Sequence, residues 1–119
     1  IGRVPYEQIA TYYALADLFI IPTLEDNWSL VVPEAMATGL PIACSVYNGL
    51  WPEMVTPGNG WIFDPLNTEE FAKSLNDIFS QRDSFQKMGN KSKEIVQSYT
   101  PQKAAEGIWQ ACNIAIDNS

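Results

Sequence analysis

The chain has 119 residues, of which 46% are hydrophobic and 18% charged, and its formal net charge at pH 7 is -7. This composition is typical of one globular domain, or part of one, with enough apolar side chains for a core. The acidic balance, without a cluster of Lys and Arg, argues against binding to nucleic acid or directly to an anionic membrane. Because there is neither a run near the roughly 20 apolar residues of a membrane span nor a secretion signal, we expect a cytoplasmic location, with the full-length protein cytoplasmic or peripheral at the membrane.

The residue types that most often carry metal and acid-base chemistry are scarce. The sequence has no His and two cysteines, Cys44 and Cys112. Each cysteine lies in an apolar or amphipathic stretch, which favours a small buried side chain over a disulfide or a metal ligand. We therefore predict no metal site and no cofactor.

The first half of the chain alternates between helix-like and strand-like segments. Residues 1–4 resemble the end of a strand, as if the chain were cut just before Gly2. Amphipathic spacing predicts helices at 6–16 and 30–38, the second with Ser29 as its N-cap and Gly39 as its stop. Short apolar runs predict strands at 17–22, 40–44 and 61–63. The run at 17–22 is apolar on both faces, which favours a central parallel strand. The loop at 45–60 is expected to include a helical turn at 53–55.

The second half of the chain is predicted to be almost entirely helical. Asn67 and Glu70 form a capping box for one helix. The next helix is marked by Phe85, Met88, Ile95 and Val96, and Thr100 with Pro101 opens the last one. The apolar stripes of these helices are predicted to face the core, and the stripe of the last helix is formed by Ala105, Ile108, Trp109, Cys112 and Ile116. The whole pattern predicts an α/β fold, with a parallel sheet and helices on its faces.

Three acids, Glu25, Asp26 and Glu34, crowd together in the stretch TLEDNWSLVVPEAMATG at 23–39. In an open parallel sheet, ligands bind beyond the carboxyl ends of the strands, which is where this stretch is placed. The first turn of the helix at 30–38 favours an anion such as a phosphate, and Glu34 could reach past it to a pair of sugar hydroxyls. Acids are also common at helix N-termini, and about 1.6 acid pairs at the eight-residue spacing of Asp26 and Glu34 are expected by chance. The pattern alone therefore leaves a solvated loop open as an alternative.

The run ADLFIIPTLEDNWSLVVPEAMATGLPIAC at 16–44 strongly resembles the signature of group 1 (family 4) glycosyltransferases of the GT-B fold. IGRV at 1–4, NGLWPEMV at 48–55 and NGWIF at 59–63 resemble the segments that flank this signature. The resemblance implies that residues 1–119 are part of a C-terminal nucleotide-sugar-binding domain. It implies a truncated Rossmann-like sheet, with the N-terminal acceptor domain and the first βα units absent.

The resemblance also implies roles for individual residues of the donor site. Glu34 would bind the ribose hydroxyls, the amides of Leu30 and Val31 would hold the diphosphate, and Arg3 and Val4 would border the base. The transferred sugar would be contacted by Asp26, the residue assigned to catalysis, by Asn27, and by the backbone of Trp28 and Ser29. Two positions depart from the usual pattern of the family: Asp26 stands where Glu is usual, and Ser29 stands where Gly is frequent.

The function that the resemblance implies is retaining sugar transfer from a nucleotide-sugar to a glycan or lipid-linked acceptor, as in polysaccharide biosynthesis. A UDP- or GDP-sugar would be the substrate, and no metal would be required. The Arg and Lys that neutralise the departing diphosphate would precede Ile1, so residues 1–119 alone are expected to be inactive. The exposed edge of a truncated sheet predicts self-association. A catalytically silent nucleotide-sugar-binding module and a GT-B epimerase or phosphorylase remain alternatives.

Overall fold

Three parallel strands form the centre of the molecule. The structure is a computed structural model, and it describes residues 2–26 and 29–118. The strands are β1 (Phe19–Ile21), β2 (Ile42–Ser45) and β3 (Gly60–Phe63), and they lie in the order β1-β2-β3. Because both strand pairs are parallel, all three strands end at the same edge of the sheet. The predicted strands and the α/β class are confirmed.

The position of β1 within the sheet differs from the prediction. In the described part of the chain β2 is the central strand, and β1 pairs only with β2. Ile20, in the middle of β1, is 36% exposed, so its side chain is not covered as a central strand would require. A run of apolar residues shows that both faces of a strand can be buried, but it does not specify how many strands lie on either side.

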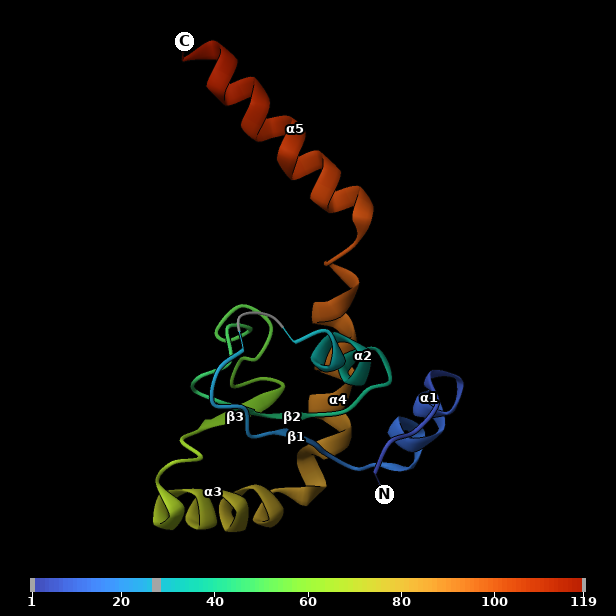
Figure 1. The fold of residues 1–119 in the computed structure, drawn as a ribbon, viewed down its shortest axis with the longest axis vertical. Helices are drawn as coiled ribbons and strands as arrows, with labels where there is room; N and C mark the ends of the chain where they lie inside the picture. Colours follow the sequence, from blue (N-terminus) through green and yellow to red (C-terminus); the bar gives the residue numbers. More distant parts are fainter. Residues whose placement is uncertain (1, 27–28, 119) are drawn as a thin grey trace.

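Five α-helices and one 3-10 turn complete the described chain. They are α1 (Tyr6–Leu15), α2 (Val31–Ala37), α3 (Thr68–Ser80), η1 (Arg82–Ser84), α4 (Phe85–Gln97) and α5 (Pro101–Asp117). Figure 1 shows α2 and α3 on opposite sides of the sheet, and α4 packs against α2. The segment at 49–54 forms hydrogen-bonded turns, and the Met54 N–H donates to the Leu50 carbonyl at 2.9 Å, so the helical turn lies a few residues before the predicted 53–55.

Alternate residues of β2 point into two separate apolar clusters. Ile42 and Cys44 are buried with residues of α2, including Val32 and Met36. Ala43 faces the opposite cluster, whose buried members include Phe63, Ile78 and Phe85. This two-sided burial explains why β2 is apolar throughout. It also packs α2 against one face of the sheet.

Two glycines allow α2, α4 and β2 to meet closely. Gly39 ends α2 with a φ of 86°, a left-handed conformation that favours glycine, and so confirms the predicted stop. Gly89 lies in α4 against this turn, where an added Cβ would be 1.9 Å from the carbonyl oxygen of Gly39. The position of the helix that carries Glu34 therefore depends on this contact between backbones.

Helix capping follows the prediction at two of three sites. The side chain of Asn67 accepts the Glu70 N–H at 3.1 Å at the beginning of α3, and Thr100 accepts the Lys103 N–H at 3.2 Å at the beginning of α5. The prediction for Ser29 is wrong, because Leu30 occupies the N-cap position of α2 and no side chain caps it. The Ser29 hydroxyl bonds instead to Asp26.

The last helix does not pack on the core. Every described residue of α5 is exposed, including Cys112, and Trp109 is 68% exposed. Figure 1 shows α5 projecting away from the rest of the molecule. The prediction of a core-facing stripe is therefore wrong: amphipathic spacing shows that a helix has a face to bury, but not that a surface lies opposite it. No helix within residues 2–26 and 29–118 is long and apolar enough to cross a membrane.

Candidate functional site

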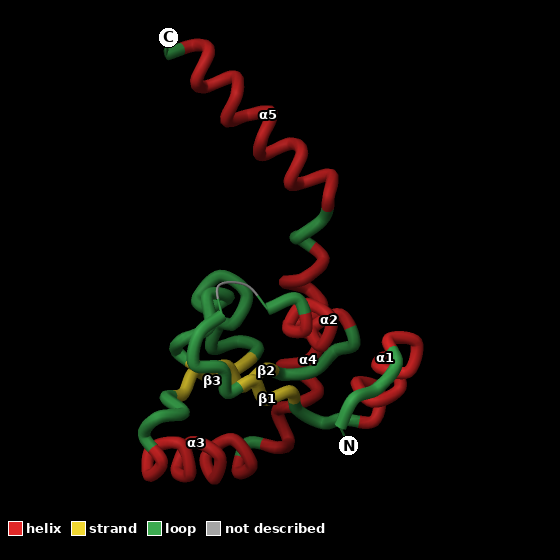
Figure 2. The backbone as a smooth tube through the Cα atoms, in the orientation of Figure 1, coloured by secondary structure: helices red, strands yellow, loops and turns green. Residues whose placement is uncertain are grey.

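Two loops meet at the carboxyl edge of the sheet. We call residues 22–30, which follow β1, the acidic loop, and residues 46–59, which follow β2, the glycine loop. Asp26 forms an isolated parallel bridge with Asn48, and the Gly49 N–H donates to the Asp26 carbonyl at 2.7 Å. Figure 2 shows the loops gathered at this side of the sheet. At Asp26 the backbone of the acidic loop is therefore bound to the backbone of the glycine loop.

Asn48 is the main side-chain connection between the two loops. It is 1% exposed. Its side-chain nitrogen donates to Thr23 Oγ1 at 3.3 Å and to Ser29 Oγ at 2.8 Å, and its Oδ1 accepts the Leu50 N–H at 3.1 Å. The Asn48 amide therefore makes three hydrogen bonds, and its burial is compensated.

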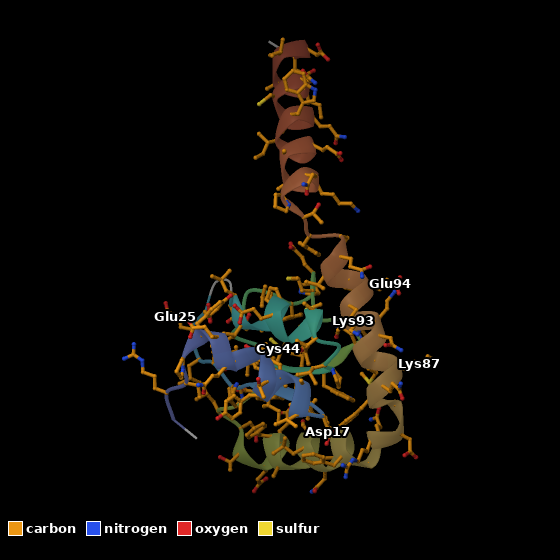
Figure 3. The ribbon with its side chains drawn as sticks, turned by 90° about the vertical axis from the view of Figure 1, so that its right-hand side faces the viewer. Asp17, Glu25, Cys44, Lys87, Lys93 and Glu94 are labelled. Atoms are coloured by element: carbon orange, nitrogen blue, oxygen red, sulfur yellow. The ribbon has the colours of Figure 1, made fainter. Side chains whose placement is uncertain are left out.

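Ser29 links this amide to the acidic loop. The hydroxyl of Ser29, which is 4% exposed, donates to Oδ2 of Asp26. Asp26 itself is partly exposed at the same edge. The neighbouring acid Glu25 is exposed, and Figure 3 shows it at the rim of the domain. Two acids that are adjacent in sequence therefore have different environments.

Glu34 lies one turn inside α2 and is partly buried. Its Oε2 accepts a hydrogen bond from the phenol of Tyr13 in α1 at 3.2 Å. Burial, and then the charge of Glu34, raise the pKa of Tyr13 above its ordinary value. The Tyr13 ring packs edge-to-face on Phe19, with centroids 6.0 Å apart. The Tyr13 side chain therefore contacts Phe19 through its ring and Glu34 through its hydroxyl.

A cavity of about 390 Å³ opens between α1 and α2 beside this pair of residues. Glu34 and Thr38 line it from α2, and residues between Tyr6 and Tyr13 line it from α1. A neighbouring cavity of about 500 Å³ is lined by Arg3 and Val4, and both cavities share Tyr6 and Ile9. The residues predicted to contact a ribose and a base therefore line adjoining hollows around α1.

The remaining predicted positions lie at the beginning of α2. Leu30 and Val31 are 72% and 41% exposed, and the first amides of a helix have no acceptor within the helix. The predictions for Asn27 and Trp28 fall outside the described residues. Asp26 thus precedes the beginning of α2 in the acidic loop, and Glu34 lies one turn inside the helix.

Sequence reasoning gave no site role to Tyr13 or Asn48. Tyr13 was identified only as part of an apolar helix face, although a buried tyrosine hydroxyl usually needs a polar partner. Asn48 belongs to the run NGLWPEMV at 48–55, and Asn is common in turns because its side chain bonds to nearby backbone. Neither pattern identifies the hydrogen-bond partner, which is Glu34, 21 residues away, for Tyr13 and Ser29, 19 residues away, for Asn48.

Cys44 lies in the core beneath the acidic loop. It is fully buried, whereas Cys112 is exposed, and Figure 3 labels Cys44 among the central elements of the domain. Burial, followed by the charge of Asp26, raises the pKa of the Cys44 thiol to about 11. The prediction of a small buried side chain is confirmed for Cys44 and wrong for Cys112.

Comparison with known proteins identifies the family. The sequence profile described as "Glycosyl transferases group 1" matches residues 1–95, which include all three strands and both acids of the candidate site. The chain belongs to this family. The family profile ends within α4 and does not include α5.

Curated relatives from plants and bacteria agree with this membership of the group 1 glycosyl transferases. Sulfoquinovosyl transferase SQD2 of Arabidopsis thaliana is 26% identical over 120 residues, covering 98% of this chain and 22% of the relative. D-inositol 3-phosphate glycosyltransferase of Nocardia farcinica is 25% identical over 112 residues, covering 94% of this chain and 25% of the relative. The chain thus spans about a quarter of the length of these glycosyl transferases.

Solved structures of glycosyl transferases show the same fold. Sucrose-phosphate synthase from Thermosynechococcus elongatus superposes on 100% of this chain and 30% of its own, with a TM-score of 0.78 and 24% identity. The C-terminal domain of a group 1 family protein (LpcC) from Francisella tularensis covers 83% of this chain and 51% of its own, with a TM-score of 0.70 and 22% identity. The predicted Rossmann-like fold of a C-terminal GT-B domain is confirmed.

Proposed function

We propose that this chain is the nucleotide-sugar-binding part of a retaining glycosyltransferase. In this proposal it binds a UDP- or GDP-sugar as substrate, and the full-length protein transfers the sugar to a glycan or lipid-linked acceptor. Family membership supports sugar transfer in general. The donor, the retaining stereochemistry, a place in polysaccharide biosynthesis and a cytoplasmic location are the parts that we add.

The observation that carries this proposal is the position of Glu34. Its carboxylate lines a cavity of about 390 Å³ between α1 and α2, one turn inside the helix that follows β1, and open α/β folds bind ligands near the loops and helix N-termini that follow their strands. A carboxylate can accept hydrogen bonds from two adjacent hydroxyls, as the ribose of a nucleotide offers. Arg3 and Val4, in the adjoining cavity, would then border the base.

The diphosphate would lie between these groups and the acidic loop. We assign it to the amides of Leu30 and Val31, which are exposed and begin α2 between Asp26 and Glu34 in the sequence. Negative charge grows on the departing diphosphate as the glycosyl bond breaks, so amides aimed at it stabilise the transition state more than the bound donor. Asp26, with Asn27 and the backbone of Trp28 and Ser29, would contact hydroxyls of the transferred sugar.

The acceptor and the remaining catalytic groups would come from other parts of the full-length protein. The chain covers 22% and 25% of two curated relatives, which supports a division of the active site between this domain and another. We therefore expect residues 1–119 alone to be inactive. Sedimentation of this polypeptide should also show self-association through the exposed edge of β1, and a stable monomer would contradict that expectation.

The decisive experiment is calorimetric titration of the full-length protein with UDP-, GDP- and ADP-sugars. At least one should bind, and Glu34→Ala should weaken that donor by about tenfold or more, because hydrogen bonds to a charged group are lost. Asp17→Ala is the matched control, because Asp17 is an exposed acid at the amino end of β1 whose partner is Arg82. Binding by none of the three donors, or unchanged binding by Glu34→Ala, would refute the proposed site.

A further inference from the structure

A directed chain of hydrogen bonds runs from the glycine loop to the carboxylate of Asp26. The Asn48 amide nitrogen donates to Ser29 Oγ at 2.8 Å, and the Ser29 hydroxyl donates in turn to Asp26 Oδ2. A hydroxyl has one proton, so a serine that accepts from an amide and faces a carboxylate has its donor directed at the carboxylate. Asn48 and Ser29 are both buried, which fixes the geometry of the chain.

We propose that Asn48 is a positioning residue that acts through Ser29 to orient the Asp26 carboxylate toward the transferred sugar. The proposal rests on the proposed function, in which Asp26 contacts that sugar. The acidic loop has no helix or strand of its own at Asp26, so its side chain needs an external support. Asn48 supplies this support from the next loop, where its side chain also bonds to Thr23 and Leu50.

The contact between Ser29 and Asp26 joins three side chains into one unit. The Ser29 hydroxyl donates to the Asp26 carboxylate and accepts from the Asn48 amide. The hydroxyl therefore holds the carboxylate, and Asn48 holds the hydroxyl.

A second buried Asn–Ser pair offers an internal comparison. Asn59 donates to Ser92 Oγ at 3.3 Å and to the Met54 carbonyl at 3.0 Å, and both Asn59 and Ser92 are fully buried. This pair lies at the amino end of β3, opposite the acidic loop. Removal of the Ser92 hydroxyl therefore tests the loss of a buried serine without a change at Asp26.

The test compares affinities for nucleotide-sugars with affinities for the matching nucleoside diphosphates in the full-length protein. The probes are UDP, GDP and ADP with UDP-glucose, GDP-mannose and ADP-glucose. Ser29→Ala should reduce the affinity for the nucleotide-sugar that binds by about tenfold, while the affinity for its diphosphate stays within about twofold. Ser92→Ala should leave both affinities within about twofold. Both Ser29→Ala and Ser92→Ala remove a buried hydrogen bond, so we expect both to lower thermal stability.

Double variants separate positioning from a general loss of packing. If Ser29 acts on the sugar through Asp26, then adding Ser29→Ala to Asp26→Ala should cause no further loss of sugar-specific affinity. Asn48→Ala should reproduce the effect of Ser29→Ala, and the two changes together should be no worse than either alone. Additive effects, or equal losses for the diphosphate and the nucleotide-sugar, would overturn the positioning role.

The outcomes also distinguish this inference from the proposed function. If no probe binds, or if Asp26→Ala leaves nucleotide-sugar affinity unchanged, the proposed function of the site fails and the positioning role fails with it. If Asp26→Ala weakens the nucleotide-sugar but Ser29→Ala behaves like the unmodified protein, the positioning role alone is wrong. Loss in Asp26→Ala and in Ser29→Ala, but not in Ser92→Ala, supports it.

Discussion

The phenol of Tyr13 donates a 3.2 Å hydrogen bond to Oε2 of Glu34, which joins α1 to the first turn of α2. The described residues of α1 include none that is fully buried, and Tyr13 is one of two that are partly buried. The ring of Tyr13 packs on Phe19 of β1, so the same side chain contacts the sheet and the carboxylate. The orientation of Glu34 is thus coupled to the position of α1.

We predict that Tyr13→Phe weakens nucleotide binding without unfolding the domain. Phenylalanine keeps the ring contact with Phe19 but loses the donor to Glu34, so the carboxylate is no longer held toward the cavity. A hydrogen bond to a charged group contributes about 1.5 to 3 kcal/mol, and we expect a loss of about tenfold in affinity for UDP or GDP. Calorimetric titration of the full-length protein measures this loss.

The control for this prediction is Tyr12→Phe, because Tyr12 is the neighbouring tyrosine in α1 and is 40% exposed. The affinity of Tyr12→Phe for UDP or GDP should match that of the unmodified protein. Equal affinities in the two variants would show that the Tyr13 hydroxyl does not support binding.

Much of the fold follows from short-range features of the sequence. The N-cap at Asn67, the glycine stop at Gly39 and the apolar runs of the strands each act within a few residues, and all three predictions are confirmed. The place of β1 in the sheet and the surroundings of α5 depend on what lies across from them. Among the described strands β2 and not β1 is central, and the predicted core-facing stripe of α5 is wrong, because an apolar face does not specify its partner.

The candidate site divides in the same way. The loop after β1 and the acid inside α2 could be located from the sequence, because ligands gather beyond the carboxyl ends of parallel strands. The links from Tyr13 to Glu34 and from Asn48 to Ser29 bridge 21 and 19 residues. Such links require the packing of α1 on α2 and of one loop on another, which no local pattern specifies.

Asp26 and Glu34 should differ in which part of the donor they affect. Asp26 lies in the acidic loop beside the glycine loop, whereas Glu34 lines the cavity between α1 and α2. We predict that Asp26→Ala lowers turnover at least tenfold while UDP or GDP affinity changes by less than about threefold. Steady-state kinetics and titration of the full-length protein measure the two effects.

Glu25→Ala is the control for Asp26→Ala, because Glu25 is the adjacent acid and is exposed. It should change neither turnover nor affinity. A fall in nucleotide affinity for Asp26→Ala as large as the fall in turnover would refute the division of roles.

The contact between α2 and α4 should tolerate no side chain at Gly89. A Cβ at this position would lie 1.9 Å from the Gly39 carbonyl oxygen, which is backbone and cannot swing aside. We predict that Gly89→Ala lowers the free energy of unfolding by about 3 kcal/mol, because the helices must separate. Urea denaturation, followed by circular dichroism, measures the change.

Gly107 in α5 provides the opposite case, since an added Cβ there would meet nothing within 4 Å. Alanine is the better helix former, so Gly107→Ala should raise helical content and stabilise α5 by no more than about 1 kcal/mol. Destabilisation by Gly107→Ala equal to that by Gly89→Ala would show that close packing at Gly89 is not the cause.

Stability should fall in alkaline solution because of Cys44. Burial and the charge of Asp26 raise the pKa of the folded thiol from 9.0 to about 11. The unfolded chain therefore releases this proton at a lower pH than the folded chain, and deprotonation favours unfolding. The contribution of Cys44 is fully present below pH 9 and is lost as the pH rises to about 11.

A shift of this size corresponds to roughly 2 to 3 kcal/mol of unfolding free energy across that interval. Urea midpoints at pH 7, 9 and 10.5 should decline less in Cys44→Ala than in the unmodified chain, although the variant begins from a lower midpoint because it loses a buried sulfur. Cys112→Ala is the control, because Cys112 is exposed, and it should keep the full decline. Tyr13 also has a raised pKa but is present in every variant, so its effect cancels in the comparison. Parallel declines in all three proteins would show that the Cys44 thiol is not the titrating group.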